Sequence, residues 1–97
     1  MQGYIVTERA LAQLEAMIRY IAERNFTAAK NVNKSIFEAF DFLAQNPKAG
    51  RERPELSGDY RYRFWVVMNN YLIAYTDGDI VTIHAIFHSA RDIPHLL

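Results

Sequence analysis

The sequence has no cysteine, no net charge and no apolar run long enough to cross a lipid bilayer. Without cysteine, disulfides and thiolate metal sites are excluded, and a reducing compartment suits the chain. Equal numbers of basic and acidic side chains, 11 of each, give no overall attraction to nucleic acid. Because no charged and then apolar leader opens the chain, we expect a cytoplasmic protein without a membrane partner.

What remains is the composition of a folded protein. Hydrophobic residues fill 51% of the 97 positions and aromatic residues 13%, which is enough for a core in a single domain, residues 1–97. The charges are unevenly spread, since residues 48–63 hold five basic and three acidic side chains. This middle segment is the basic stretch of an otherwise balanced chain.

The first half of the sequence has the spacing of two amphipathic helices. Apolar residues recur at steps of three and four, as in Leu11, Leu14, Ile18 and Ile21, and a short link between the helices favours an antiparallel hairpin. The predicted boundaries are an extended segment at Tyr4–Val6, a Thr7 cap before a helix from Glu8 to Asn25, and a Thr27 cap before a helix that stops at Asn46-Pro47.

The second half changes to a period of two, which is typical of strands. Prolines and glycines make Pro47–Asp59 a predicted loop, and Asn69-Asn70 and Asp77-Gly78-Asp79 are predicted turns. The strands expected between these breaks span residues 60–68, 71–76 and 80–88. Helices followed by a meander predict an α+β fold, in which the hairpin packs on a small antiparallel sheet made of the short N-terminal strand and the three-stranded meander.

Two histidines lie on the last predicted strand. Alternation places Val81, Ile83, Ala85 and Phe87 on the core face, and places His84 and His88 together on the opposite face. Their Cα atoms would be about 13 Å apart at a strand rise of about 3.3 Å per residue, which is too far for one metal ion. We therefore expect no metal site and no cofactor.

Covalent catalysis has little support either. Ser89 follows His88 directly, but neighbours on a strand point to opposite faces, so this histidine is badly placed as its base. The basic side chains are more informative. Arg61 and Arg63 share a predicted strand face with Trp65, which could bind a phosphate, a stacked base or a protein carboxylate, or could simply be a solvated face.

The sequence resembles the ParE branch of the RelE/ParE toxins of bacterial type II toxin–antitoxin modules. The resemblance covers nearly the whole chain, and its most specific pieces are "NPKAG", "NNYLIAY" and the closing "HSARDI". It implies the same helical hairpin on a small sheet. It also implies a cognate antitoxin, with which the toxin forms a hetero-oligomer, and a cellular target. A toxin dimer is a further possibility, because an uncovered sheet face invites association.

The resemblance leaves the target open between two kinds. ParE-type toxins poison DNA gyrase, causing growth arrest and serving plasmid maintenance, whereas RelE-type toxins cleave mRNA on the ribosome. Leu72 stands where RelE-type enzymes commonly carry an arginine, and Leu97 falls near their C-terminal tyrosine. A leucine can neither transfer a proton nor neutralise a phosphate, so we favour a gyrase inhibitor that is not an enzyme and contacts no nucleic acid directly.

Two alternatives stay open from the sequence. In a metal-independent ribonuclease, Arg91, His84 and His88 would be the catalytic candidates, since histidine titrates in the useful range. In a member without toxicity, the fold would serve binding alone; His84, where ParE-like sequences often have arginine, leaves room for this. The residues predicted to bind target or antitoxin are Arg61, Arg63, Trp65, His84, His88 and Arg91.

Overall fold

The two long helices begin where side chains satisfy free backbone N–H groups. Thr7 Oγ1 accepts the N–H of Ala10 at 3.2 Å and starts α1, Glu8–Ala22. Asn25 Oδ1 accepts the N–H of Ala28 at 3.0 Å and starts α2, Phe26–Gln45. The predicted cap at Thr27 is therefore wrong, because the preceding asparagine already takes that role and Thr27 lies inside the helix.

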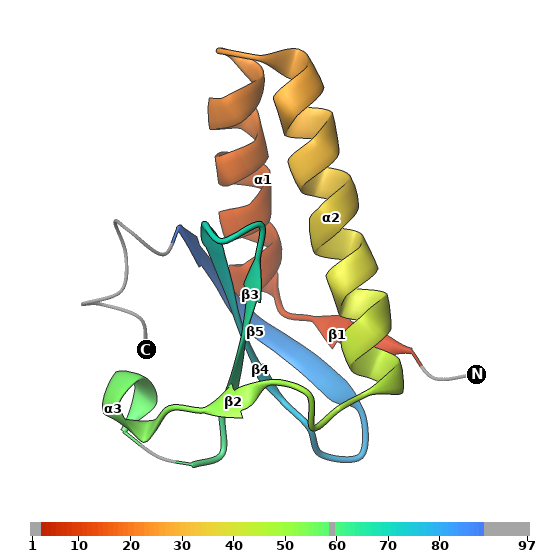
Figure 1. Ribbon diagram of the computed structural model, residues 1–97, viewed down its shortest axis with the longest axis vertical. Helices are drawn as coiled ribbons and strands as arrows, with labels where there is room; N and C mark the ends of the chain where they lie inside the picture. Colours follow the sequence, from red (N-terminus) through yellow and green to blue (C-terminus); the bar gives the residue numbers. More distant parts are fainter. Residues whose placement is uncertain (1–2, 59, 89–97) are drawn as a thin grey trace.

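The computed structural model describes residues 3–58 and 60–88, in which a helical hairpin packs on a five-stranded sheet (Figure 1). The strand order is β1-β5-β4-β3-β2, with β1 parallel to β5 and the other pairs antiparallel. No helix in this part of the chain has the length and apolar character to span a membrane. The remaining elements are β1 Tyr4–Val6, β2 Arg51–Glu52, α3 Pro54–Ser57, β3 Arg63–Val67, β4 Tyr71–Thr76 and β5 Val81–His88.

The predicted α+β class is confirmed, with two corrections to the sheet. The sheet is mixed rather than antiparallel, because the N-terminal strand pairs in parallel with β5. The predicted loop at Pro47–Asp59 contains the edge strand β2 and the short helix α3. A two-residue strand and a single helical turn are too short to leave a periodic pattern in the sequence.

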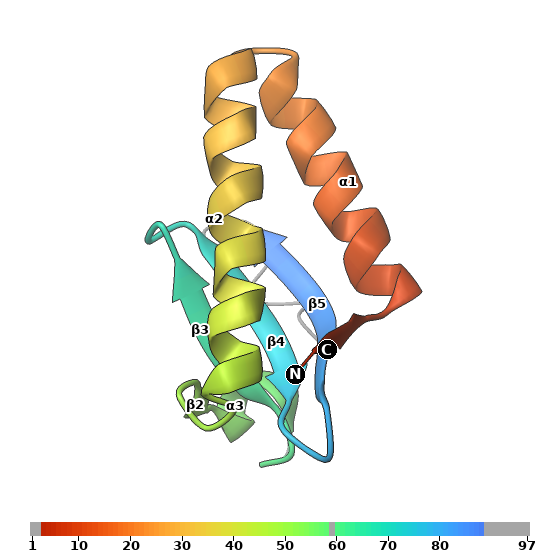
Figure 2. The ribbon, with the colours of Figure 1, turned by 90° about the vertical axis from the view of Figure 1, so that its right-hand side faces the viewer.

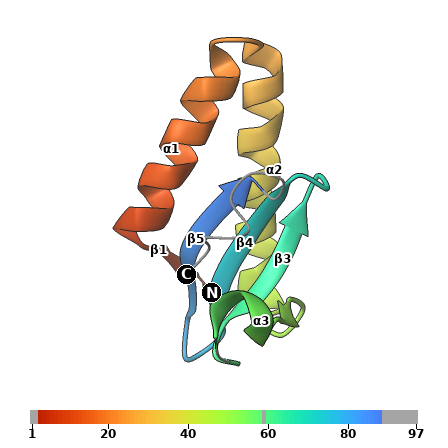
Figure 3. The same ribbon diagram turned by 90° about the vertical axis from the view of Figure 1, so that its left-hand side faces the viewer.

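The two helices cover the sheet in different ways. Figures 2 and 3 show α2 crossing one face of the sheet, whereas α1 lies along the β5 edge, and the loop joining the helices projects beyond the strands. Beyond the short β1, side chains of α1 and of its N-cap Thr7 supply hydrogen-bond partners that a strand would otherwise provide. Gln13 Oε1 accepts the N–H of Ile86 at 2.9 Å, and Thr7 Oγ1 donates to the His84 carbonyl at 3.3 Å. An edge that could pair with other chains is thus capped by side chains.

An irregularity in β5 reverses the predicted alternation of its side chains. Ala74 pairs with Ala85 and Tyr75 with Ile83, so His84 is an extra residue in a β-bulge. Val81, Ile83 and Ile86 pack in the core cluster under the helices, while Ala85 and Phe87 belong to a second cluster on the other face. The prediction of one continuous core face through Phe87 is wrong, because the bulge moves the second half of the strand out of phase.

Candidate functional site

The end of the sheet that carries the β4–β5 turn is hollowed by a pocket of about 540 Å³. Three residues predicted from the sequence, Arg61, Arg63 and His84, line this hollow together. Mixed charges and aromatic rings make up the rest of the wall: Glu52, Tyr60, Tyr62, Thr76, Asp77, Gly78, Asp79, Ile80 and Thr82. We call this hollow the turn pocket.

Arg63 mainly stabilises the fold. Its side chain is 17% exposed, and Nε donates to Asp77 at 2.9 Å while Nη1 donates to the Gly50 carbonyl at 2.9 Å. Glu52 on β2 is a further carboxylate at 3.7 Å. The guanidinium therefore joins β3 to the preceding loop and to the end of β4, and little of it is left for a partner.

The segment "NPKAG" closes over the same point, in an arrangement that we call the Tyr75 latch. Gly50 N–H donates to Tyr75 Oη at 2.8 Å, and this hydroxyl donates to the Pro47 carbonyl at 2.8 Å. Burial raises the pKa of Tyr75, so the hydroxyl keeps the proton that it donates. A Cβ at position 50 would lie 2.6 Å from that oxygen, so only glycine fits.

Asp77 links Arg63, which also contacts Gly50 of the latch, to the exposed Lys48. Its carboxylate accepts from Arg63 and, at 3.2 Å, from the exposed Lys48. Burial, the largest single influence, disfavours ionisation, but the hydrogen bonds and charges of Arg63 and Lys48 outweigh it and lower the pKa of Asp77. The carboxylate is therefore charged at neutral pH and holds both cations.

Arg61 precedes β3 and is exposed, unlike Arg63. Its guanidinium lies 5.0 Å from the centre of the Tyr62 ring, and that ring meets His84 edge-on with centroids 5.3 Å apart. His84 Nε2 shares a hydrogen bond of 2.9 Å with Thr76 Oγ1. Burial and then the charge of Arg61 lower the pKa of His84, so its ring is neutral at pH 7.

The two histidines do not share a face. His88 packs edge-on against Tyr71, with ring centroids 5.6 Å apart, on the helix-covered side of the sheet. His84 lies on the opposite side with Tyr62 and Thr76. The bulge at His84 explains why the predicted pairing of these histidines is wrong. Within residues 3–58 and 60–88, no three His, Asp or Glu side chains gather closely enough to hold a metal ion.

Trp65 lies away from the turn pocket. Its ring stacks on Phe42 of α2 with centroids 5.2 Å apart and an interplanar angle of 27°. Phe42 is 44% exposed, and the neighbouring Val66 and Met68 are 51% and 49% exposed, with Val66 on the opposite face of the sheet from Trp65. This second apolar surface lies along residues 65–67 of β3, which follow the last residue of β3 that pairs with β2. We call it the β3-edge surface, and its use remains a prediction.

The sequence prediction missed several residues of the turn pocket, and some of the residues that it named lie outside the described part of the chain. Tyr62 and Thr76 were treated as ordinary strand residues, although they hold His84 in place. The signal that could have revealed the latch is the combination of an isolated glycine and a tyrosine on a buried strand. Arg91, Ser89, Asp92 and Leu97 lie outside the described residues, so the predicted roles of Arg91 and Leu97 stay predictions.

Comparisons with known proteins agree with the fold. A model of the family described as "ParE toxin of type II toxin-antitoxin system, parDE" matches residues 4–93. No curated protein matches the sequence. Eight chains of solved structures match the structure. One, described as "Chromosomal ParDE TA system from P. aeruginosa", has a TM-score of 0.73 at 21% identity, covering 91% of this chain and 96% of its own. At that identity, the likeness establishes a common fold.

Proposed function

This chain belongs to the ParE toxin family of type II toxin–antitoxin systems, and we propose that it inhibits DNA gyrase by binding it and is neutralised by a cognate antitoxin. The family membership is the observation that carries this proposal. Under this proposal, the turn pocket and the β3-edge surface are candidate binding sites for two different proteins, the gyrase and the antitoxin.

The burial of Leu72 favours a binding role rather than cleavage. Leu72, which stands where RelE-type enzymes commonly have an arginine, is 1% exposed and packed in the second apolar cluster with Phe64 and Phe87. A buried aliphatic side chain offers no charge to a phosphate. Arg61 is the exposed cation at the rim, beside aromatic rings that suit a protein contact.

The gyrase proposal is tested with the purified chain and purified enzyme. We expect inhibition of supercoiling and accumulation of cleaved DNA, with Arg61→Ala weakening inhibition about fivefold or more, as for a contact residue. Arg51→Ala is the matched control, because Arg51 is also exposed and does not line the pocket. Absence of any effect on gyrase at concentrations that stop growth would refute the proposal.

One observation favours the alternative of a ribosome-dependent ribonuclease. His84 is neutral at pH 7 and lies in the same pocket as Arg61, Tyr60 and Tyr62, a set that could move a proton and stabilise a phosphate. This function predicts cleaved transcripts on translating ribosomes and loss of cleavage in Arg61→Ala and Arg91→Ala. Intact transcripts after induction would eliminate it.

For the antitoxin, we propose the β3-edge surface. Only Arg63 and Phe64 of β3 pair with β2, so Trp65–Val67 have no strand partner on that side among the described residues. Trp65, stacked on Phe42, lies on the helix-covered face and the exposed Val66 on the opposite face, so a strand added at this edge could contact both faces through alternate side chains. Val66→Lys should weaken the complex with the antitoxin without unfolding the chain, as measured by calorimetry. Unchanged affinity would place the antitoxin elsewhere.

A further inference from the structure

A second hollow lies between α1 and the neighbouring ends of β4 and β5. It has a volume of about 250 Å³ and is lined by Met17, Tyr20, Ile21, Tyr71 and His88. Met17 and Tyr71 are buried and form the apolar floor, while Tyr20 is 46% exposed. This volume is below that of ordinary small-molecule sites but leaves room for one large apolar side chain. We call it the α1 pocket.

A cation is held beside this pocket. The Arg24 guanidinium lies 3.8 Å from the centre of the Tyr20 ring, and its Nη1 donates to the Tyr20 carbonyl at 3.1 Å. Met17, Tyr20 and Ile21 lie at helical spacing along one side of α1, and Arg24 follows in the turn after the C-cap Glu23, whose carboxylate lies 4.0 Å from it. Because stacking and a hydrogen bond already fix Arg24, a carboxylate arriving there would meet a partly ordered cation.

The charges of the helical hairpin favour an acidic binding partner at its tip, where α1 and α2 are joined. Residues 19–34 carry four basic side chains, Arg19, Arg24, Lys30 and Lys34, and one acidic, Glu23, for a net charge of +3. The parts of the helices nearer the sheet carry Glu8, Arg9, Glu15, Glu38 and Asp41, for a net charge of −3. Since such charges act over about 8–10 Å at physiological salt, the tip attracts anionic groups that the base repels.

We propose that the α1 pocket is a docking site for a partner-protein segment in which a bulky apolar side chain stands next to a carboxylate. The apolar side chain fills the hollow above Met17 and Tyr71, and the carboxylate pairs with Arg24. This site lies at the end of the molecule opposite the turn pocket and does not depend on the identity of the toxin's target. Short peptide contacts commonly combine such an apolar anchor with a flanking charge.

Nucleic acid suits this place less well. DNA-binding proteins typically make roughly six to ten phosphate contacts, and these contacts release counterions from the DNA. A segment with a net charge of +3 would release fewer of them. The hollow itself is apolar, and the Tyr20 ring that a base would stack on is already occupied by Arg24. An acidic and apolar polypeptide satisfies both the hollow and the cation.

The test titrates a blocked peptide, Asp-Leu-Phe-Glu, into the isotope-labelled full chain and follows amide chemical shifts. We expect shifts at Met17–Arg24 and at the end of β5, and weaker binding of two matched peptides, Asn-Leu-Phe-Gln and Asp-Ala-Ala-Glu. A short DNA duplex serves as the competing ligand. Equal binding of the uncharged peptide, tighter binding of the duplex, or shifts elsewhere would each overturn the proposal.

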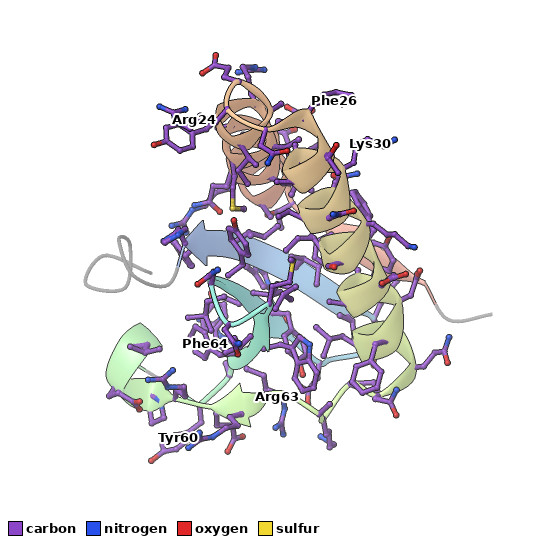
Figure 4. All side chains as sticks on the ribbon, turned by 45° about the horizontal axis from the view of Figure 1, so that its top comes forward. Arg24, Phe26, Lys30, Tyr60, Arg63 and Phe64 are labelled. Carbon is purple, nitrogen blue, oxygen red and sulfur yellow. The ribbon has the colours of Figure 1, made fainter. Side chains whose placement is uncertain are left out.

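Variants within the same hairpin provide matched controls. Figure 4 shows Arg24 on one flank of the tip and Phe26 and Lys30 on the other, and Lys30 also lies over an aromatic ring, 6.0 Å from the centre of Phe26. Arg24→Glu should weaken the peptide by about fivefold and Tyr20→Ala by about threefold, the scale of an exposed ion pair or rim contact. Lys30→Glu and Phe26→Ala should change the affinity less than twofold.

All four substitutions are at exposed positions, so the fold should survive them. Equal losses from both flanks would mean that the net charge of the tip alone attracts the peptide, which would overturn the pocket as the site. The gyrase assay above is judged separately, because wild-type inhibition of gyrase does not require this peptide to bind.

Discussion

Arg61 and Arg63 are two residues apart in the sequence, yet the regions around them have different properties. Arg63 is held by Asp77 and the Gly50 carbonyl, inside an arrangement that also includes the Tyr75 latch. Arg61 lies on an aromatic ring at an open rim. A basic stretch near a pocket therefore divides into residues that build the site and residues that line its open rim.

Gly50→Ala should produce the largest effect on the first region. The added Cβ would lie 2.6 Å from Tyr75 Oη and 3.0 Å from the Phe64 carbonyl, so the latch must open or shift. We expect a loss of about 3 kcal/mol in the free energy of unfolding, measured by urea denaturation. Gly78→Ala is the control, because a Cβ there meets nothing within 4 Å. Equal midpoints for the two variants would show that the latch is unimportant.

A comparison of Arg63→Ala with Arg61→Ala tests directly whether the two arginines have different roles. Removing Arg63 leaves Asp77 and the Gly50 carbonyl with fewer partners, and should cost about 2 kcal/mol in the free energy of unfolding. Removing Arg61 should cost less than about 0.5 kcal/mol, as at other exposed positions. Urea denaturation measures both. If Arg61→Ala were the more destabilising, the division into building and acting residues would be wrong.

Tyr75→Phe isolates the hydroxyl from the ring. The ring still fills its buried site, but the Gly50 N–H and the Pro47 carbonyl lose their partner. We expect a loss of about 1.5 kcal/mol and faster hydrogen exchange at the Gly50 amide. Tyr60→Phe, at a 68% exposed position, should change neither quantity. Unaltered exchange at Gly50 in Tyr75→Phe would contradict the latch.

The smallest effect concerns the pH response of the open region. The pKa of His84 is lowered in the folded chain, so folding favours the neutral ring. This part of the stability is present above the ordinary value of 6.5 and is lost as the pH falls below it. Arg61→Ala should raise the pKa of His84, seen by NMR titration, and reduce the loss of stability between neutral and acidic pH. A pKa unchanged by this substitution would disconnect the two residues.

Much of the architecture was predictable because it depends on local signals. Thr7, the apolar spacing of both helices and the turn at Asp77-Gly78-Asp79 act within a few residues of themselves. The turn after β3 was placed correctly, but its positive φ angles, 54° and 63°, fall on Met68 and Asn69 rather than on the two asparagines. Sequence alone locates such a turn better than it assigns its residues.

The site was less predictable, because its residues act through partners far away in the chain. Arg63 meets Gly50 and Asp77, which come from different segments, and no local pattern reports that three-way meeting. Trp65 finds Phe42 on a helix that precedes it by more than twenty positions. The pairing of β5 with β4 likewise decides which face each histidine occupies.

By itself, the sequence determined the two helices, the three meander strands and the resemblance to a toxin family, since periodicity, caps and turn residues are properties of neighbouring residues. Only the tertiary structure decided that β1 runs parallel to β5, that the bulge at His84 separates the two histidines, and that Arg63 is largely buried while Arg61 is exposed. The physical reason is that register and ion pairing are set by contacts across the sheet, where a shift of one residue exchanges the two faces.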